Sequence, residues 1–334
     1  MNPVGRLFPS PVKSGWLPVL SLLLLIFWVN GCTLFKINVI PGVTPLKEKT
    51  IAGEGDHKIL VVDISGMISN QKAVNTLGVE TKLGMVDRVR EILKKAEEDD
   101  EIRGVLLRIN TPGGTVTSSD IIYHEIKAFK RRRHIKVFAM VMDLAASGGY
   151  YIAQAADQII AHPTSLTGSI GVIALKMNLR GLMDKVGVDF EVVKSGDKKD
   201  FLSPFRPLTE DERQIFQNTI DTLHERFVAT IEEGRKNLSR EEIKKLADGR
   251  IYTSRQALDL KLIDHIGYIE DVQSIIKKSL GLPTLRLITY HRTGQYKSNV
   301  YSMPATPPAV QFNLVNLNFI PKTPEPNFMY LWMP

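Results

Sequence analysis

The chain has 334 residues, a hydrophobic content of 43% and a formal net charge of +7. This composition excludes a disordered chain, and the length predicts one large globular domain or two small ones. The single cysteine excludes an intrachain disulfide framework and a multi-cysteine metal site. The one dense basic cluster falls at the end of a predicted helix, which is typical of a solvated helix terminus. We therefore expect no nucleic-acid partner.

The N-terminal segment has the features of an export signal. Arg6 and Lys13 precede an apolar run from Trp16 to Val29, which ends shortly before Cys32. The run has the length of a signal-peptide core and is short for a membrane span of about 20 residues. Two anchors stay open: an uncleaved helix, and lipid attachment at Cys32, because the ending resembles a bacterial lipoprotein signal. Either anchor predicts that the rest of the chain lies outside the cytoplasm, beside a membrane.

Strand and helix patterns alternate in the next part of the chain. Short, buried-strand patterns are separated by helices with an apolar stripe, and this order predicts an α/β fold with a parallel sheet. We expect strands over residues 58–65, 104–109, 135–142, 158–161 and 190–193, and helices over residues 79–98, 118–130 and 148–156.

The pattern turns helical after Pro207. An acidic first turn follows Thr209, which predicts an N-cap for a long amphipathic helix to about residue 236. Ser239 and Ser254 are expected to cap two shorter helices, and a last helix is expected over residues 269–280. The proline-rich end of the chain is expected to lack an independent fold and to pack through its apolar residues on a surface or a partner.

The segment Asp143–Tyr151 has the composition of a sharp turn between a buried strand and a helix. Small residues surround Ser147, which would stand at the helix N-terminus. Backbone N–H groups and the helix dipole stabilise an oxyanion at such a position. The pattern makes Ser147 a candidate nucleophile, although a tight turn with a capping serine explains this segment alone equally well.

A second turn between strand and helix, Pro112-Gly113-Gly114, follows the preceding strand. Its glycines present backbone N–H groups without obstruction by side chains. Gly114 and Gly148 are therefore candidates for two donors that converge on one carbonyl oxygen, as acyl transfer requires. Either turn alone is explained more simply as a connection, but two such turns on successive strands favour a catalytic site.

A serine nucleophile needs a base, and none of the seven histidines has a setting that marks it as one. A lysine can replace histidine if burial lowers its pKa from the usual value of about 10.4. Spacing does not choose among three lysines that follow the predicted strand at residues 190–193, namely Lys194, Lys198 and Lys199. Taken alone, this charged segment is typical of a solvated loop.

Small and hydroxyl-bearing residues also follow the strand predicted at residues 158–161, over residues 163–172. A substrate backbone could approach this segment, and Ser169 could hydrogen-bond a neutral lysine amine. A structural turn is an equally good explanation of this segment by itself.

Four motifs in this order resemble the bacterial signal peptide peptidase A family in its short form, with a single catalytic domain. They are Asn110–Gly114, Ala146–Tyr151, Leu166–Val172 and Ser195–Asp200, within a resemblance that spans roughly residues 57 to 285. Any one motif is weak, and their order makes the resemblance specific. It implies a ClpP/crotonase-like α/β fold, a repeated β-β-α superhelix with a helical C-terminal part.

The resemblance also implies a role for each site residue. Ser147 matches the nucleophile, Lys199 the general base, Gly114 and Gly148 the oxyanion donors, and Ser169 the hydroxyl that orients the lysine. The family pattern Ser-Gly-x-x-Lys-Asp selects Lys199 from its neighbours. No metal or cofactor is implied. The implied substrates are hydrophobic signal peptides left in the membrane, and the implied assembly is a homo-oligomeric ring in which neighbouring subunits complete each site.

We therefore expect a membrane-associated serine endopeptidase. Its parts would be a signal peptide or anchor at residues 1–31, a linker at 32–56, a peptidase domain at 57–285 and a proline-rich tail at 286–334. One rival is a crotonase-like acyl-CoA hydratase or hydrolase, which export disfavours because coenzyme A is mainly cytoplasmic. The other is a non-catalytic membrane scaffold, which the presence of both serine and lysine disfavours.

Overall fold

The computed structural model describes residues 45–71, 73–74, 80–292, 299, 301 and 328–333. These residues all belong to one unit, Pro45–Pro334. The predicted export signal and Cys32 lie outside the described residues. Within the described part of the chain, no helix combines the length and the apolar character needed to cross a bilayer.

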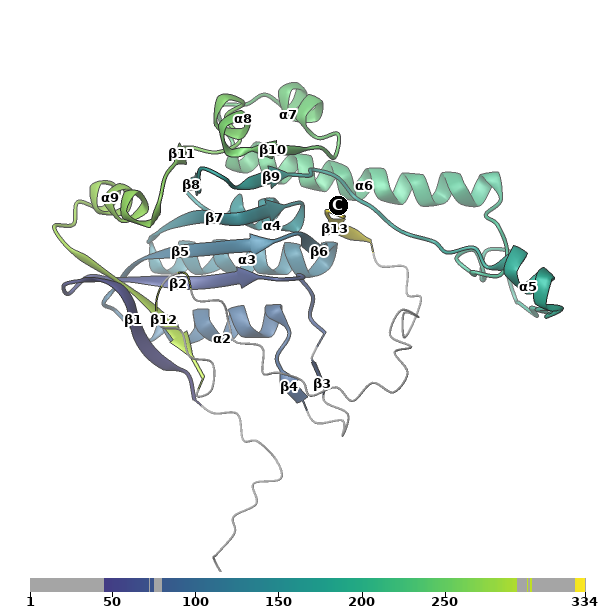
Figure 1. Ribbon diagram of the computed structural model, residues 1–334, viewed down its shortest axis with the longest axis horizontal. Helices are drawn as coiled ribbons and strands as arrows, with labels where there is room; N and C mark the ends of the chain where they lie inside the picture. Colours follow the sequence, from purple (N-terminus) through teal and green to yellow (C-terminus); the bar gives the residue numbers. More distant parts are fainter. Residues whose placement is uncertain are drawn as a thin grey trace, which may run out of the picture. The chain divides into compact units, whose positions relative to one another are not determined.

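A nine-stranded sheet forms the centre of this unit, with the main order β1-β12-β2-β5-β7-β8-β11 (Figure 1). The strands from β12 to β11 run parallel, and β1 is added antiparallel at one edge. Parallel strands need crossover connections, which the helices supply. The strands on this path are β1 (Lys47–Glu54), β2 (Lys58–Ser65), β5 (Ile102–Thr111), β7 (Lys136–Ala146), β8 (Gln158–Ala161), β11 (His265–Ile266) and β12 (Leu285–His291).

Strand β7 changes its partner near its end. Its residues Phe138–Val141 pair with β8, whereas Leu144–Ala146 pair in parallel with β9 (Leu166–Gly168). Strand β10 (Ile251–Thr253) then pairs antiparallel with β9. The last residues of β7 therefore pair with β9 and not with β8.

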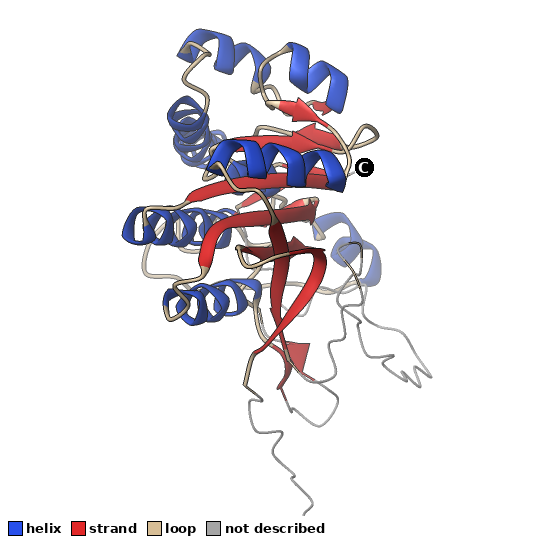
Figure 2. Ribbon diagram, turned by 90° about the vertical axis from the view of Figure 1, so that its left-hand side faces the viewer, coloured by secondary structure: helices blue, strands red, loops and turns tan. Residues whose placement is uncertain are grey.

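Helices cover both faces of the sheet (Figure 2). Because side chains alternate along a strand, Leu60 and Val62 of β2 enter one apolar core, while Ile59 and Val61 enter the other. This two-sided burial explains why the central strands read as continuous apolar runs. The first core is covered by α2 (Met85–Glu97), α3 (Val116–Arg133), α4 (Gly148–Ala153) and α6 (Glu210–Gly234), and the second by α9 (Ile269–Leu280).

The predicted helix starts in the C-terminal half are largely confirmed. Thr209 caps α6 and Ser239 caps α7 (Arg240–Leu246), each within a capping box. Helix α8 (Ser254–Asp259) begins one residue earlier than predicted, because Thr253 and not Ser254 is its N-cap. The remaining short elements are β3 (Ala73–Val74), β4 (Glu80–Lys82), β6 (Gly113–Thr115), α5 (Arg180–Val186) and β13 (Met329–Leu331).

Three sequence predictions differ from the structure. Residues 190–193 form no strand; their β-branched pattern has no partner strand among the described residues, and Val193 is 96% exposed. Strand β1 lies inside the predicted linker, because its backbone pairs with β12. The predicted tail contributes both β12 and β13 to sheets, so part of it is ordered through pairing with distant strands.

We predict that Phe129→Ala lowers the free energy of unfolding by about 3–5 kcal/mol, because it leaves a cavity where α3 packs on the sheet. Phe129 is fully buried in the first core. Urea unfolding followed by circular dichroism measures this loss. Ile121→Ala on the same helix is the control; Ile121 is 37% exposed, and a loss below about 1 kcal/mol is expected. Equal losses in the two variants would contradict the packing of α3.

Candidate active site

The predicted sharp turn after β7 is confirmed. Strand β7 ends at Ala146, and α4 begins at Gly148, so Ser147 is the only residue between them. Its backbone has φ 52° and ψ −111°, in a region that residues with a side chain rarely adopt. Ser147 N donates to Gly168 O of β9 at 2.7 Å, and Ser147 O accepts from Tyr151 N within α4 at 2.9 Å. These contacts hold the serine in a strained elbow at a helix N-terminus.

The Ser147 hydroxyl has an unusual environment. The residue is 1% exposed, and Oγ makes no hydrogen bond to any described residue. Buried hydroxyl groups normally have a partner, so one that lacks it requires an explanation. A group that arrives from outside the described part of this chain would provide one.

The glycine turn after β5 leaves no space for side chains. A Cβ atom on Gly114 would lie 1.9 Å from Ile68 O, and one on Gly113 would lie 1.9 Å from Tyr330 O. Gly113 also has φ +105°, which favours glycine. The turn is held by Thr111, whose Oγ1 accepts from Gly113 N at 3.0 Å and donates to Gly66 O at 2.6 Å. Only residues without a side chain therefore fit at positions 113 and 114.

The glycine turn and the start of α4 lie against each other. A Cβ atom on Gly113 would lie 3.0 Å from the backbone nitrogen of Gly148. The first turn of α4 and the strand β6 thus present N–H groups to the same small region. This is the arrangement predicted for a pair of donors to one carbonyl oxygen.

The C-terminal strand β13 occupies this region. It pairs antiparallel with β6, with Tyr330 opposite Gly114, as Figure 1 shows beside α4. Val116 N donates to Phe328 O at 3.1 Å and Trp332 N donates to Pro112 O at 2.8 Å. In an antiparallel ladder, every second pair of opposite residues is hydrogen-bonded. Because the pairs Val116–Phe328 and Pro112–Trp332 are bonded, the pair between them, Gly114–Tyr330, is bonded as well. Gly114 N–H therefore points at the Tyr330 carbonyl oxygen.

A second segment of backbone holds the other side of β13. Ile173 N donates to Met329 O and Met329 N donates to Ile173 O, each at 2.9 Å. Strand β13 therefore lies between β6 and the segment that follows β9. Proteins commonly bind an extended peptide in this way, by adding it to an exposed strand edge.

Ser169 lies next to the elbow. The register of β7 with β9 pairs Ala146 with Gly168, which places Ser147 and Ser169 at the ends of neighbouring strands. Ser169 also has a positive φ, 49°, and its backbone nitrogen donates to Arg250 O at 2.8 Å. Four predicted site residues, Ser147, Gly114, Gly148 and Ser169, are thus gathered at one end of the sheet.

Lys199 is not gathered with them. It lies on residues 174–208, a segment that we call the arm, which contains α5 and extends away from the sheet (Figure 1). Of the three lysines that spacing left open, Lys194 pairs with Asp200 at 2.6 Å and Lys198 pairs with Asp211. The hydrogen bond to Asp211 raises the pKa of Lys198, which disfavours a neutral amine there. Lys199 is exposed and forms no ion pair with any described residue.

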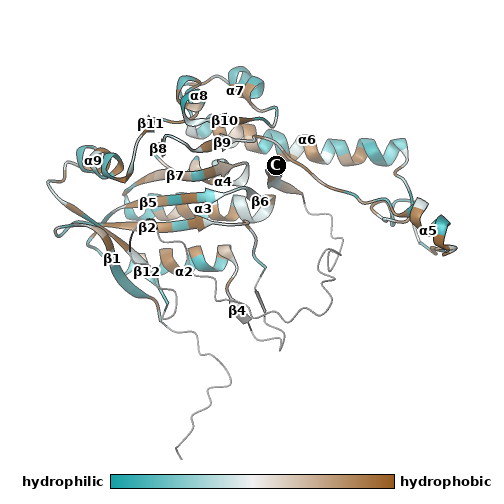
Figure 3. Cartoon of the chain, in the orientation of Figure 1, coloured by the Kyte–Doolittle hydropathy of each residue, from teal (hydrophilic) through white to brown (hydrophobic). Residues whose placement is uncertain are grey.

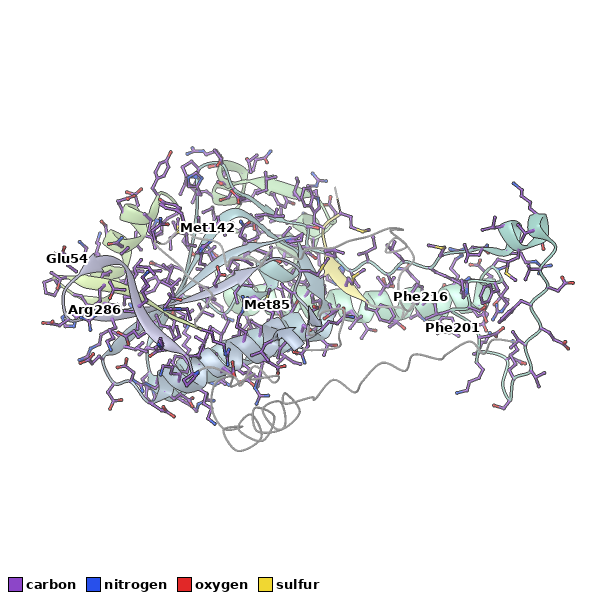
Figure 4. The ribbon with its side chains drawn as sticks, turned by 60° about the horizontal axis from the view of Figure 1, so that its bottom comes forward. Glu54, Met85, Met142, Phe201, Phe216 and Arg286 are labelled. Carbon is purple, nitrogen blue, oxygen red and sulfur yellow. The ribbon has the colours of Figure 1, made fainter. Side chains whose placement is uncertain are left out.

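An arginine joins the arm to α6. Arg206 Nε and Nη2 donate to the two carboxylate oxygens of Asp200, each at 2.8 Å, and Arg206 Nη1 and Nη2 donate to Glu212 at 2.8 and 2.6 Å. The hydrogen bond from Arg206 lowers the pKa of Glu212 to about 2. Phe201 of the arm contacts Phe216 of α6, with 6.0 Å between ring centroids, far from Met85 and Met142 (Figure 4). The residue after Lys199 is therefore anchored to the first turn of α6.

Sequence reasoning missed four residues that contribute to this region. Ile68 and Tyr330 contact the glycine turn from segments distant in the sequence, and no motif marks them. Thr111 stands inside the motif Asn110–Gly114, and its hydroxyl beside the glycine pair was the available signal. Lys176 donates to Arg206 O at 2.5 Å, and burial lowers its pKa.

Known proteins resemble this chain over most of the described part. Peptidase family S49 matches residues 129–282, and the Clp protease family matches residues 56–167. A protein of Enterococcus faecium named for signal peptide peptidase SppA is 36% identical over 263 residues, which cover 78% of this chain and 75% of that protein. A protease of Synechocystis sp. is 44% identical over 188 residues, 56% of this chain and 67% of the protease. Protease 4 of Haemophilus influenzae is 32% identical over 63% of this chain and 33% of its own length.

The parallel sheet and the two family matches together define this chain as a serine peptidase with an α/β fold of the ClpP/crotonase type. The chain belongs to the signal peptide peptidase A family, within peptidase family S49. The family, the fold class and the enzyme class predicted from the four motifs are therefore confirmed.

We predict that Gly113→Ala reduces kcat/KM for a peptide substrate by about 10²–10³-fold, the effect of losing one oxyanion donor, because the new methyl group would displace the carbonyl that the turn receives. Steady-state hydrolysis of a fluorogenic peptide measures this. Gly281→Ala is the control: Gly281 also has a positive φ, +66°, but a Cβ atom there meets nothing within 4 Å. Both variants bear backbone strain, so an equal loss of activity would show that space at the turn is unimportant.

Proposed function

We propose that this serine peptidase hydrolyses peptide bonds with a Ser147–Lys199 dyad, in which the lysine comes from a neighbouring subunit. The pairing of β13 with the glycine turn carries the proposal, because it presents an extended peptide to the start of α4. Two further observations support the origin of the base. Ser147 Oγ has no partner among the described residues, and Lys199 is exposed on an arm that extends away from its own sheet.

The surface of the arm supports a second copy of this chain as the partner. Figure 3 shows hydrophobic stretches along it. Exposed apolar patches of this kind mark interaction sites. A ring of copies would cover the arms and bring each Lys199 to the next Ser147. The eight large apolar side chains of the arm that are at least 40% exposed are Leu175, Met177, Leu182, Val186, Val188, Phe190, Val192 and Val193.

The proposed reaction has two acyl-transfer steps. The neutral Lys199 amine takes the proton from Ser147 Oγ as the oxygen attacks the substrate carbonyl, and the N–H groups of Gly114 and Gly148 stabilise the resulting oxyanion. Lys199 then returns the proton to the leaving amine, which departs as the C–N bond breaks. The same amine then deprotonates a water molecule, whose oxygen attacks the acyl carbonyl; as the bond to Ser147 Oγ breaks, the lysine returns the proton to Oγ. Ser169, at the end of the neighbouring strand, would orient the lysine amine.

We assign remnant signal peptides as the substrates and a membrane surface as the location. The name of the Enterococcus faecium relative supports the substrate class, and the export signal predicted from the sequence supports the location. An apolar peptide released into a membrane would suit a groove that binds extended backbone and buries an apolar side chain.

We predict that Ser147→Ala and Lys199→Ala are each inactive as pure proteins and that co-assembly of the two restores hydrolysis. If each site takes its serine from one copy and its lysine from the next, random mixing in equal amounts gives roughly a quarter of sites with both residues. Hydrolysis of a fluorogenic apolar peptide, measured after co-expression of the two variants, gives the recovered fraction.

Two outcomes contradict parts of this proposal. Turnover by either pure variant would exclude that residue from the dyad. No recovery in mixed oligomers, verified as mixed by mass spectrometry, would place both residues in one chain. Lys198→Ala is the matched control on the arm, and it should retain turnover.

We predict that Arg206→Ala lowers kcat by about 10²-fold, because Asp200 loses its anchor and the adjacent Lys199 is misplaced by about 1 Å or more. Steady-state kinetics and thermal unfolding of the same preparation separate this effect from loss of the fold. Arg180→Ala is the matched control: Arg180 is on the same arm and pairs with Asp184 at an exposed site. An unchanged kcat in Arg206→Ala would exclude Arg206 as a positioning residue.

A further inference from the structure

The side-chain hydroxyl of Thr111 connects the glycine turn to the loop after β2. Thr111 is fully buried at the end of β5. Its Oγ1 accepts from Gly113 N at 3.0 Å and donates to Gly66 O at 2.6 Å. A threonine that bonds the backbone N–H two residues later stabilises a turn. The hydroxyl therefore holds the backbone directly before Gly114, the first proposed oxyanion donor.

The methyl group of the same threonine lies against the first turn of α4. A Cβ atom on Gly149 would lie 2.6 Å from Thr111 Cγ2, closer than real Cβ atoms come to other atoms. The missing side chain of Gly149 leaves room for this methyl, which packs on the backbone next to Gly148, the second proposed donor. Threonine carries its hydroxyl and its methyl on one stiff, branched Cβ. One side chain thus contacts both elements that supply the donors.

Ser119 of α3 makes a second bridge between the same two elements. It is fully buried, and its Oγ donates to Thr115 O, at the end of β6, at 2.9 Å. A Cβ atom on Gly148 would lie 2.5 Å from the same Oγ. The hydroxyl of Ser119 therefore fills the space between the end of β6 and the first residue of α4.

The separation of these two elements decides how well an oxyanion is stabilised. Each donor must lie about 2.7–3.1 Å from the position of the oxyanion. A misplacement of about 1 Å costs on the order of 10²-fold in rate. A backbone N–H group has no rotatable side chain with which to adjust, so its position depends on the residues that pack beneath it.

We infer that Thr111 and Ser119 are positioning residues, which hold the glycine turn and the start of α4 at the separation that two oxyanion donors need. Because both residues are fully buried, they act through the backbone and do not touch the peptide. The inference rests on the proposed function and adds the side chains that keep its N–H donors in place. A positioning role weakens the tetrahedral state more than it weakens peptide binding, whereas a purely structural role does not discriminate between them.

Substitutions at Thr111 separate its two groups. Thr111→Val keeps the shape and removes the hydroxyl, so kcat should fall by about 10- to 100-fold while KM stays within about twofold. Thr111→Ser keeps the hydroxyl and removes the methyl, so kcat should fall by about two- to tenfold. Steady-state hydrolysis of a fluorogenic apolar peptide by the full chain measures both. An unchanged kcat in Thr111→Val would overturn the inference.

Thr289→Val is the matched control. Thr289 is 1% exposed, and its hydroxyl also donates to a backbone carbonyl, Val61 O, at 3.4 Å. It lies on β12, which β2 and β5 separate from β7. Its substitution should leave kcat and KM unchanged. A loss equal to that of Thr111→Val would show that any buried threonine of the sheet has this effect, and would also overturn the inference.

A pair of inhibitors distinguishes positioning from packing. A peptide aldehyde forms a covalent adduct when Ser147 Oγ bonds to its carbonyl carbon, the π electrons move to the oxygen and the serine proton passes to Lys199. The matching peptide alcohol cannot form this bond. In Thr111→Val and Ser119→Ala, the inhibition constant of the aldehyde should rise by the factor by which kcat/KM falls, about two- to tenfold for Ser119→Ala. The alcohol should stay within about twofold, and equal weakening of both inhibitors would overturn the inference.

Thermal unfolding and oligomeric mass, measured on the same preparations, show which variants fold. If Thr111→Val does not fold, Thr111→Ser and Ser119→Ala decide, and wild-type kcat in both would overturn the inference. Hydrolysis that depends on Ser147 but is insensitive to all three substitutions refutes the positioning role and leaves the proposed function standing. A wild-type protein that shows neither Ser147-dependent hydrolysis nor inhibition by the aldehyde refutes both.

Discussion

The hydrogen bond from Ser147 N to Gly168 O is the contact on which the geometry of the candidate active site depends. It joins the end of β7 to β9 at the residue where the backbone takes a positive φ, a conformation that costs of order 1–3 kcal/mol and persists only when surrounding contacts enforce it. All six residues of α4 are buried, so the helix that follows cannot shift to relax the strain. This bond and the burial of α4 together hold the N-terminal N–H groups of the helix in place.

In the proposed mechanism, the arm supplies the lysine and the rest of the described chain supplies the serine and the oxyanion donors. Buried backbone contacts hold Ser147, the glycine turn and β13 in place. The arm holds its lysines among exposed charges, and Arg206 supplies the anchor to α6 through Asp200 and Glu212. Such a division is consistent with the proposed site, in which one copy supplies the serine and the next copy the lysine.

Local sequence signals predicted the parts of the site that are made by one turn each. The small residues around Ser147 and the pair Gly113-Gly114 require sharp turns, and both turns formed as expected. The hydrophobic periodicity of the sequence did not predict which segments, far apart along the chain, pair with each other. The β-branched run at residues 190–193 reads as a strand but has no described partner, whereas β13 has only three residues and gains its order from β6. The position of Lys199 relative to Ser147 is likewise not encoded in a local pattern, because the two residues lie on separate parts of the described chain.

Strand β13 is held on both sides by backbone hydrogen bonds. Hydrogen bonds to β6 and to Ile173 are available to any extended chain, so they cannot distinguish one peptide from another. A tethered segment of the same chain has a high effective concentration, and it therefore enters such a groove more readily than a free peptide. Discrimination must come from side-chain pockets. The side chain of Tyr330 contacts the rings of Tyr151 and Phe227 and donates to Leu223 O, so its side-chain contacts add specificity that the backbone hydrogen bonds lack.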